Sequence, residues 1–182
     1  DTFSEAWDRE KAEVEWEEGE DQGQLKDSGL AMTSHYYEQV GQKLRPLMIE
    51  QGTTVDVEGV PVKVVIDLVE RDGKIRDFKT AKRTPAKDEA DRSIQLSTYA
   101  MAYREMMGER ESGAQLDYTV NLKSGPKITH LETSIDDARI ERTKALIKGV
   151  AQAISSGMFY PVEEGMACSY CPFKDVCKGG KS

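Results

Sequence analysis

The 182-residue sequence has few of the features that mark membrane, secreted or disulfide-rich proteins. It contains no run of about 18 uncharged apolar residues, so no transmembrane helix and no membrane partner are expected. The first residues form neither a basic segment nor an apolar one, so we expect no signal peptide, and the missing initiator Met suggests native residues upstream. Three cysteines, an odd number, disfavour a disulfide framework. These features predict a cytoplasmic protein.

Basic residues are too few to balance the acidic ones, but the imbalance is local. The chain holds 25 Lys and Arg against 33 Asp and Glu, a formal net charge of −8. Residues 1–21 contain ten acidic and two basic residues, whereas the remaining 161 residues contain 23 of each. An acidic surface repels phosphates, but this argument applies only to the N-terminal segment. The rest of the chain is compatible with a nucleic-acid partner.

Composition and hydrophobic periodicity predict a single structural domain of the α/β class. The apolar fraction of 38% and the charged fraction of 32% are ordinary for a globular protein. Apolar residues at helical spacing alternate with short β-branched runs that are bounded by turn residues. We expect helices over residues 1–18, 26–48, 91–107 and 134–156, and strands over 53–57, 62–69, 74–80, 116–122 and 128–133.

This order of elements favours a mixed central sheet flanked by helices. Residues 1–49 are expected to form an N-terminal helical part, and residues 50–160 the core that contains the sheet. Residues 161–182 form a tail that carries the cysteines. All three parts are expected to belong to one structural domain.

Acidic residues occupy two neighbouring predicted strands. Asp67 interrupts an otherwise apolar strand, where an ionised carboxylate must be paired or must bind a metal. Asp77 and Lys79 lie two residues apart on the next strand, so both face the same side. A three-residue loop over 71–73, with Gly at its left-handed position, would set Asp67 opposite Asp77. A two-residue loop would shift the register and separate the two acids.

Two carboxylates and a lysine on one face suit metal-assisted hydrolysis. Facing carboxylates repel unless a cation lies between them, and oxygen ligands suit Mg²⁺ or Mn²⁺. A nearby lysine can orient or polarise a water and stabilise charge on a phosphate. The pattern therefore favours phosphodiester hydrolysis, and a structural ion network is the alternative that the residues alone leave open.

The run Ile66–Ala81, followed by Gln95 and Tyr99, resembles the PD-(D/E)xK nucleases of the RecB-like branch. This branch includes the nuclease domains of RecB and AddB and the CRISPR-associated exonucleases. The resemblance implies a restriction-endonuclease-like fold and a set of five catalytic residues. In that set Asp67, Asp77 and the backbone carbonyl of Phe78 bind Mg²⁺ or Mn²⁺, and Lys79 is catalytic. The set is completed by Gln95 and Tyr99, which lie one helical turn apart beside the site.

The same resemblance implies a metal-dependent DNA nuclease. An exonuclease that acts on single-stranded ends is expected, in DNA repair, in recombination or in phage and CRISPR processes. A helicase or another recombination protein is the expected partner. The alternative is a non-catalytic DNA-binding or scaffold subunit of a helicase–nuclease complex.

Cys168, Cys171 and Cys177 have the spacing C-x2-C-x5-C, which allows thiolates to share a metal. Zinc and iron–sulfur sites usually need four protein ligands, one more than these cysteines supply. The segment, with Pro and Phe after the second cysteine, resembles the C-terminal part of the [4Fe-4S] motif of AddB-like and CRISPR-associated nucleases. A [4Fe-4S] cluster is therefore expected, and Zn²⁺ in an interaction module is the alternative.

Two elements of that family are not recognisable here: an upstream cluster cysteine and a metal-binding His in a G-x-x-x-H helix. His35 does not fit the helix pattern, and His130, at the end of a predicted strand, is not expected to bind metal. We expect the chain to begin after both elements. A degenerate, inactive relative is the alternative.

Positive charge gathers around the second acidic strand. Residues 74–92 hold seven Lys and Arg against four Asp and Glu. The loop that follows the strand carries Lys82, Arg83 and Lys87, which could contact DNA phosphates. A solvated charged loop is the alternative.

Overall fold

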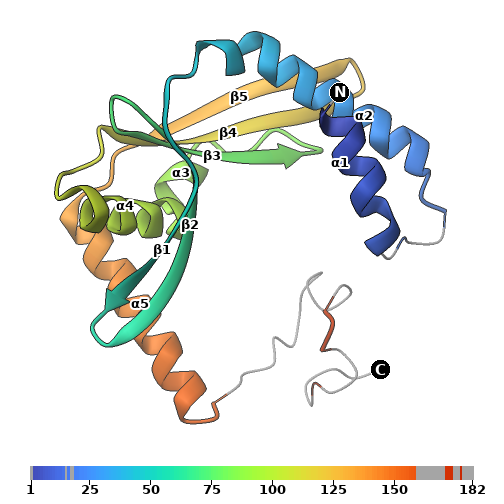
Figure 1. The fold of residues 1–182 in the computed structure, drawn as a ribbon. Coiled ribbons are helices and arrows are strands. Elements are labelled where there is room, and N and C mark those ends of the chain that lie inside the picture. The colour runs from blue at the N-terminus through green and yellow to red at the C-terminus, as the bar shows by residue number, and fades with distance from the viewer. Residues whose placement is uncertain (1, 15, 17–18, 159–170, 174–176, 178–182) are drawn as a thin grey trace.

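A five-stranded mixed sheet forms the centre of the molecule (Figure 1). The computed structural model describes residues 2–14, 16, 19–158, 171–173 and 177. The strands lie side by side in chain order: β1 (Pro46–Val57), β2 (Val60–Glu70), β3 (Lys74–Ala81), β4 (Gly113–Leu122) and β5 (Gly125–Thr133). Neighbouring strands are antiparallel except for β3 and β4, which are parallel. The expected α/β class with a mixed central sheet is confirmed.

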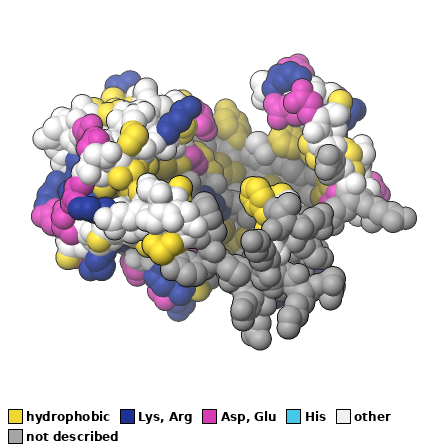
Figure 2. All heavy atoms as spheres, turned by 90° about the horizontal axis from the view of Figure 1, so that it is seen from below, with side chains coloured by type: hydrophobic (Ala, Val, Ile, Leu, Met, Phe, Trp, Pro, Cys, Tyr) yellow, Lys and Arg dark blue, Asp and Glu magenta, His cyan; other side chains and the backbone are white. Residues whose placement is uncertain are grey.

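Helices cover both faces of this sheet. They are α1 (Thr2–Glu10), α2 (Gln22–Gln39), α3 (Glu89–Arg92), α4 (Ile94–Met107) and α5 (Asp137–Ser155), with short 3-10 helices η1 (Lys11–Glu13) and η2 (Gly41–Lys43). Helix α2 crosses one face, and α4 and α5 cover the other (Figure 1). Figure 2 shows hydrophobic side chains exposed among charged ones on the face that is seen from below. None of the described helices is long and apolar enough to cross a membrane.

The second predicted helix, over residues 26–48, is wrong at its C-terminal end. Helix α2 ends at Gln39, and β1 begins at Pro46 rather than at residue 53. Proline has no backbone N–H and disfavours a helical conformation in the residue before it, so the helix cannot continue into this segment. The apolar residues that follow Pro46 therefore pair with β2 instead.

The first predicted helix, over residues 1–18, is also too long. Helix α1 ends at Glu10, and η1 follows it. Trp16 folds back so that its indole N–H donates to the Lys11 carbonyl at 3.1 Å. Its ring lies 5.7 Å from that of Trp7, so aromatic packing competes with a longer helix.

The crossover between the parallel strands β3 and β4 contains two helices where the sequence predicts one. Ser93 has an extended backbone and caps α4, accepting the Leu96 N–H at 3.1 Å. Gly108, in the left-handed conformation, ends α4. The predicted helix over 91–107 therefore divides at Ser93 into α3 and α4.

The hairpin of β4 and β5 has a tighter turn than the one predicted. Gly125 already pairs with Leu122, so only two residues connect the strands. Pro126 lies inside β5, where it is tolerated because β5 is an edge strand. The last helix begins at Asp137 and is capped by Asp136, close to the predicted start.

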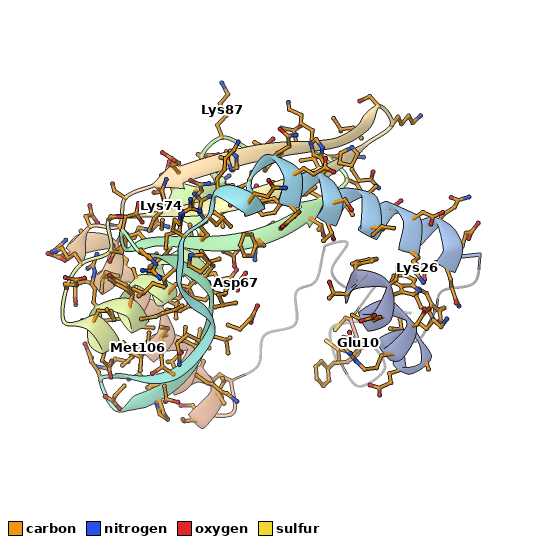
Figure 3. All side chains as sticks on the ribbon, turned by 45° about the horizontal axis from the view of Figure 1, so that its top comes forward. Glu10, Lys26, Asp67, Lys74, Lys87 and Met106 are labelled. Atoms are coloured by element: carbon orange, nitrogen blue, oxygen red, sulfur yellow. The ribbon has the colours of Figure 1, made fainter. Side chains whose placement is uncertain are left out.

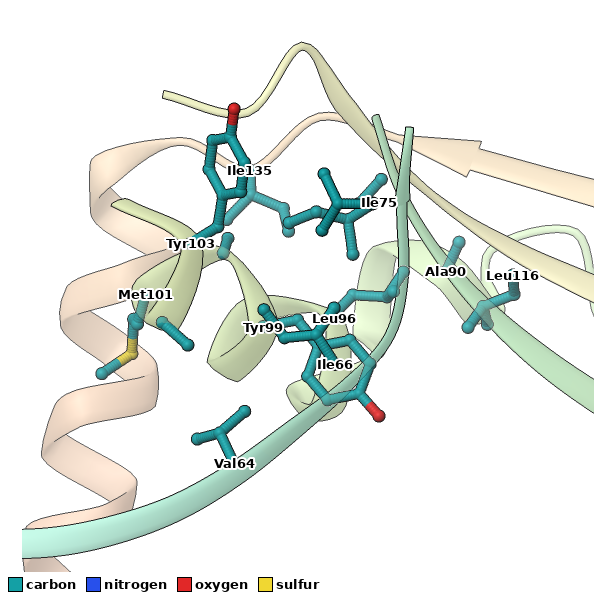
Figure 4. Packing of buried hydrophobic residues seen from close by; sticks show 14 of the residues in the cluster. Val64, Ile66, Ile75, Ala90, Leu96, Tyr99, Met101, Tyr103, Leu116 and Ile135 are labelled. Atoms are coloured by element: carbon teal, nitrogen blue, oxygen red, sulfur yellow. The ribbon is translucent and has the colours of Figure 1, made fainter. Parts of the chain in front are cut away.

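The hydrophobic core lies between the sheet and helices α4 and α5 (Figure 4). In Figure 4, Leu96 and Tyr99 of α4 face Ile66 of β2. Each fully buried large apolar side chain stabilises the fold by about 1.5–3 kcal/mol. This packing holds α4 in a fixed position against β2 and β3.

A buried arginine attaches α5 to the junction of α3 and α4. Arg139 is 8% exposed and donates to the Ala90 and Ser93 carbonyls at 2.7 and 2.9 Å. It also donates to the hydroxyls of Ser97 and Thr133 at 2.8 and 3.0 Å. Among the described residues it forms no ion pair, so neutral oxygens alone satisfy this guanidinium.

We expect Arg139→Ala to lower the free energy of unfolding by about 3 kcal/mol, because it leaves buried carbonyl and hydroxyl groups without donors. Arg142→Ala removes an exposed arginine from the same helix and should change stability by less than about 0.5 kcal/mol. Urea unfolding followed by circular dichroism measures both. Equal losses in the two variants would contradict the anchoring role of Arg139.

Candidate active site

Strands β2 and β3 separate soon after the turn that joins them. Their ladder consists of two pairs, Leu68–Arg76 and Val69–Ile75. This register belongs to a three-residue loop over 71–73, with Gly73 in the left-handed conformation, as predicted. Continued by one pair, it would set Asp67 opposite Asp77, but the ladder stops before that point.

We call the point where β2 and β3 separate the fork. At the fork, a carboxylate takes the place of the missing strand partner. The Phe78 N–H donates to Asp67 Oδ2 at 3.1 Å, so the side chain of β2 satisfies a backbone group of β3. The edge of β3 beyond this bond is not covered by β2. The fork therefore leaves an opening beside the acidic residues.

The backbone of β1 is distorted opposite Asp67. Glu50 has φ 48°, a left-handed conformation that costs a non-glycine residue on the order of 1–3 kcal/mol. It is unpaired, although its neighbours on both sides pair with β2. Consecutive side chains of a strand normally point to opposite faces of the sheet. In β2 this alternation breaks at Asp67: Ile66 packs into the core, and the next residue, Asp67, binds Tyr99 of α4 on the same face. The distortion accompanies the turning of Asp67 towards α4.

One chain of contacts joins the five residues that the sequence singles out. Tyr99 donates its hydroxyl proton to Asp67 Oδ1 at 2.9 Å and accepts from Gln95 Nε2 at 2.8 Å. Lys79 Nζ donates to Gln95 Oε1 at 2.7 Å and lies 2.8 Å from Asp77 Oδ2. Burial raises the pKa of Tyr99, and its bond to Asp67 adds to the shift, so the phenol stays protonated as a donor. Strands β2 and β3 and helix α4 thus converge on one site, whose Asp67 is labelled in Figure 3.

Asp77 is the most unusual of these residues. It is 0% exposed, and neither of its carboxylate oxygens has a hydrogen-bond partner among the described residues. The nearby Lys79 ammonium is an ion-pair partner without hydrogen-bond geometry. Burial raises the pKa of the Asp77 carboxyl; Lys79 opposes this shift, and the charge of Asp67 adds to it.

The donor set at the fork fits a hard divalent cation. A buried carboxylate without hydrogen bonds is costly unless a cation approaches it, and Asp67 supplies a second carboxylate next to it. Within the described residues no group of three or more His, Cys, Asp and Glu side chains gathers, so the two carboxylates would need ligands of another kind. A backbone carbonyl such as that of Phe78 is one such ligand, and its role stays a prediction.

Comparison with known proteins decides the family. The family model described as "PD-(D/E)XK nuclease superfamily" matches residues 1–178. The chain belongs to this superfamily. The resemblance that the acidic strands suggest is therefore confirmed at the level of the superfamily, while the RecB-like branch stays a prediction.

Two solved structures are similar to this chain. One is a crystal structure of a "Putative exonuclease" from Eubacterium rectale, with 16% sequence identity and a TM-score of 0.60, covering 98% of this chain and 76% of that chain. The other, SSO0001, has 14% identity and a TM-score of 0.49, covering 87% of this chain and 72% of that chain. None of the curated proteins matches the sequence.

The basic residues that are predicted to contact DNA do not belong to this chain of contacts. Lys82 and Arg83 are exposed in the loop between β3 and α3, as is Lys87, and none of the three forms an ion pair with the described residues. Figure 3 shows Lys87 pointing away from Asp67. Contact of this loop with DNA stays a prediction.

The cysteine tail lies mostly outside the described residues. Cys168 falls outside them, and Cys171 and Cys177 are half-buried free thiols. The structure therefore leaves the expected [4Fe-4S] cluster as a prediction.

A second buried carboxylate, which sequence analysis missed, lies one strand away. Asp117 of β4 is 1% exposed and pairs with Phe78 in the parallel ladder. Its oxygens accept from Tyr36 Oη at 2.7 Å, from Arg76 Nη1 at 2.8 Å, from His130 Nδ1 at 2.6 Å and from the Gln115 amide. A charged residue in an otherwise apolar strand is the signal that drew attention to Asp67, and it applies equally to Asp117.

Hydrogen bonds set the charge state of Asp117. Burial alone would raise the pKa of its carboxyl, but the donors Gln115, Tyr36 and His130 and the positive charge of Arg76 outweigh burial and lower it. The carboxylate therefore stays ionised and connects α2, β3 and β5 behind the active site.

We expect Asp117→Asn to lower the free energy of unfolding by about 3 kcal/mol at pH 7, because it removes the buried charge to which Tyr36, Arg76 and His130 donate and leaves Glu70 as the remaining ion-pair partner of Arg76 among the described residues. The folded pKa of Asp117 is below its unfolded value of about 3.9, so its contribution is present above that pH and is lost as the pH falls through the folded pKa. The difference between the variant and the wild type should therefore narrow below about pH 4.

Urea unfolding at a series of pH values tests this expectation. Asp88→Asn is the control, since Asp88 forms only an exposed pair with Arg92 and should cost less than about 0.5 kcal/mol at any pH. If the loss of unfolding free energy in Asp117→Asn did not depend on pH, the shape of the side chain and not its charge would stabilise this cluster.

Proposed function

We propose that this nuclease is a deoxyribonuclease that depends on Mg²⁺ or Mn²⁺ and hydrolyses phosphodiester bonds at the fork between β2 and β3. The observation that carries the proposal is the buried Asp77 carboxylate, which has no hydrogen-bond partner among the described residues and lies beside the Asp67 site. Asp67, Asp77 and the Phe78 backbone carbonyl would hold the ion. When bound, such an ion polarises a phosphate oxygen and lowers the pKa of a coordinated water.

The remaining side chains orient the reacting groups. Lys79 is fixed from two sides, by Gln95 Oε1 and by Asp77 Oδ2, and its ammonium group can donate to an attacking water or to a phosphate oxygen. Its positive charge stabilises the negative charge that develops on the phosphate. Gln95 and Tyr99 are positioning residues, because they bind Lys79 and Asp67 and pass no proton themselves.

We further propose that the substrate is the end of a single DNA strand, and that the enzyme acts as an exonuclease in the cytoplasm, in repair, recombination or phage and CRISPR processes. The resemblance of the acidic strands to the RecB-like branch supports this proposal. A helicase or another recombination protein is the partner that the resemblance implies. The exposed basic loop with Lys82, Arg83 and Lys87 would contact phosphates of the bound strand.

We expect Asp77→Ala and Lys79→Ala each to lower the rate of DNA degradation by about a thousandfold or more, because each removes a group that touches the ion or the phosphate. The measurement is release of nucleotides from end-labelled single-stranded DNA with Mn²⁺, and EDTA should abolish it. Asp72→Ala and Lys74→Ala are matched controls, since the turn Asp-Gly-Lys has the same D-x-K spacing but lies away from the fork. Unchanged digestion by either fork variant would contradict the proposal.

Isothermal titration with Mn²⁺ distinguishes the enzyme from a scaffold subunit. Binding by the wild type that Asp77→Ala abolishes supports a catalytic metal site. A wild type that binds DNA but neither binds Mn²⁺ nor degrades DNA would instead favour the non-catalytic subunit of a helicase–nuclease complex.

We propose that the cysteine tail binds a [4Fe-4S] cluster through Cys168, Cys171 and Cys177, with a fourth ligand supplied from elsewhere. The two described thiols, which are free and half-buried, suit thiolate ligation. Anaerobically purified protein should absorb visible light near about 400 nm, and Cys171→Ser should remove this absorbance while Ser169→Ala keeps it. Stoichiometric zinc without visible absorbance would favour the zinc-binding module.

A further inference from the structure

A cavity of about 270 Å³ lies between α2 and the strands β3 and β4, on the face of the sheet away from α4. Its wall includes Met32, Thr33 and Tyr36 of α2, Phe78 and Thr80 of β3, and Asp117 of β4. Pockets that take drug-sized ligands measure roughly 300–1,000 Å³, so this cavity suits one planar ring system rather than a larger molecule.

Two aromatic rings form part of this wall. The rings of Tyr36 and Phe78 lie 5.4 Å apart in an edge-to-face arrangement with an interplanar angle of 75°. Phe78 is 39% exposed, although an aromatic side chain in a central strand is usually buried. Exposed aromatic side chains next to a phosphate site are the usual platforms on which nucleobases stack.

The cavity is continuous with the candidate active site across the free edge of β3. The Phe78 N–H binds Asp67, while the Phe78 side chain lines the cavity. Lys79 belongs both to the cavity wall and to the chain of contacts that contains Asp77. Because β2 leaves β3 at this level, no strand formed by the described residues covers this edge of β3.

We infer that this cavity receives one unpaired nucleobase, which belongs to a nucleotide next to the phosphate held at the fork. The inference rests on the proposed function and explains why a single strand would be preferred. A base in the cavity lies between α2 and β3, and the volume of about 270 Å³ leaves no room there for a second, paired base.

The Asp117 carboxylate in the wall does not read the edge of a base. An ionised carboxylate offers about four acceptor positions. Tyr36, Arg76, Gln115 and His130 donate to the Asp117 carboxylate, so it has no free position for the edge of a base. Stacking on the aromatic rings therefore supplies the main contact with the base.

Binding of single-stranded DNA without divalent metal tests this inference. We expect Thr33→Trp, which fills the cavity from an exposed position of α2, to weaken the affinity for an oligodeoxythymidine of about ten nucleotides by about tenfold or more. Ser34→Trp is the control, since Ser34 is exposed next to Thr33 but is not part of the described wall. Fluorescence anisotropy in EDTA measures the affinity, and binding of a blunt duplex should be equal in both variants.

A fluorescent base reports directly on insertion. We expect 2-aminopurine, placed in turn at each position of the oligonucleotide, to be quenched at one or a few positions on binding to the wild type, because stacking quenches it. Thr33→Trp should remove this quenching. Phe78→Leu, which keeps an apolar side chain but removes the ring, is the second variant and should weaken single-strand binding by a similar factor.

Equal affinities of Thr33→Trp and Ser34→Trp, with no quenching at any position, would overturn the inference and would fit a cavity that receives an apolar side chain of a partner protein. Because the assay contains no metal, its result is separate from cleavage. Position-specific quenching by a protein that degrades no DNA would refute the proposed function and keep the base site. Degradation of DNA without quenching at any position would keep the proposed function and refute the base site.

Discussion

Burial of the Asp77 carboxylate, with the Asp67 carboxylate near it, is the constraint on which the arrangement of the candidate site depends. Lys79 is the ion-pair partner of the buried Asp77 among the described residues, and Asp67 brings a second negative charge towards it. The fold tolerates this because the surrounding elements hold both groups in place. The core fixes α4, so that Tyr99 can bind Asp67, and Gln95 fixes Lys79 beside Asp77. Lys79 supplies one positive charge for the two carboxylates, and the proposed divalent cation would lower the remaining electrostatic cost.

The two buried aspartates on adjacent strands, Asp77 and Asp117, differ in the pKa of their carboxyl groups because their surroundings differ. Asp117 accepts hydrogen bonds from four side chains, and the pKa of its carboxyl is lowered. Asp77 accepts none among the described residues, and the pKa of its carboxyl is raised. The first is a satisfied structural anion that connects α2 to the sheet. The second remains available for a ligand. Residue type and burial are alike in the two cases, and the donors and charges around each carboxylate differ.

The sequence predicts the parts of this site that depend on local spacing. The loop length and Gly73 determine the register of β2 and β3, and the helical spacing of Gln95 and Tyr99 places them on one face of α4. Local sequence patterns do not predict features that depend on contacts between distant segments. The Asp117 cluster needs α2, β3 and β5 together, and no spacing within one segment indicates these partners. The end of α2 and the start of β1 depend on Pro46 and on pairing with β2, whereas apolar periodicity alone favoured a longer helix.

The bonding of Arg139 has a consequence for how the enzyme responds to salt. Attraction between exposed charges weakens as ionic strength rises, and binding of DNA phosphates weakens in the same way. Arg139, in contrast, donates to neutral carbonyl and hydroxyl oxygens inside the protein, where dissolved ions do not reach. Concentrated salt would therefore strip nucleic acid from the surface while the junction that supports α4 stays intact. Binding of nucleic acid and integrity of the fold around α4 are thus governed by interactions that respond differently to dissolved salt.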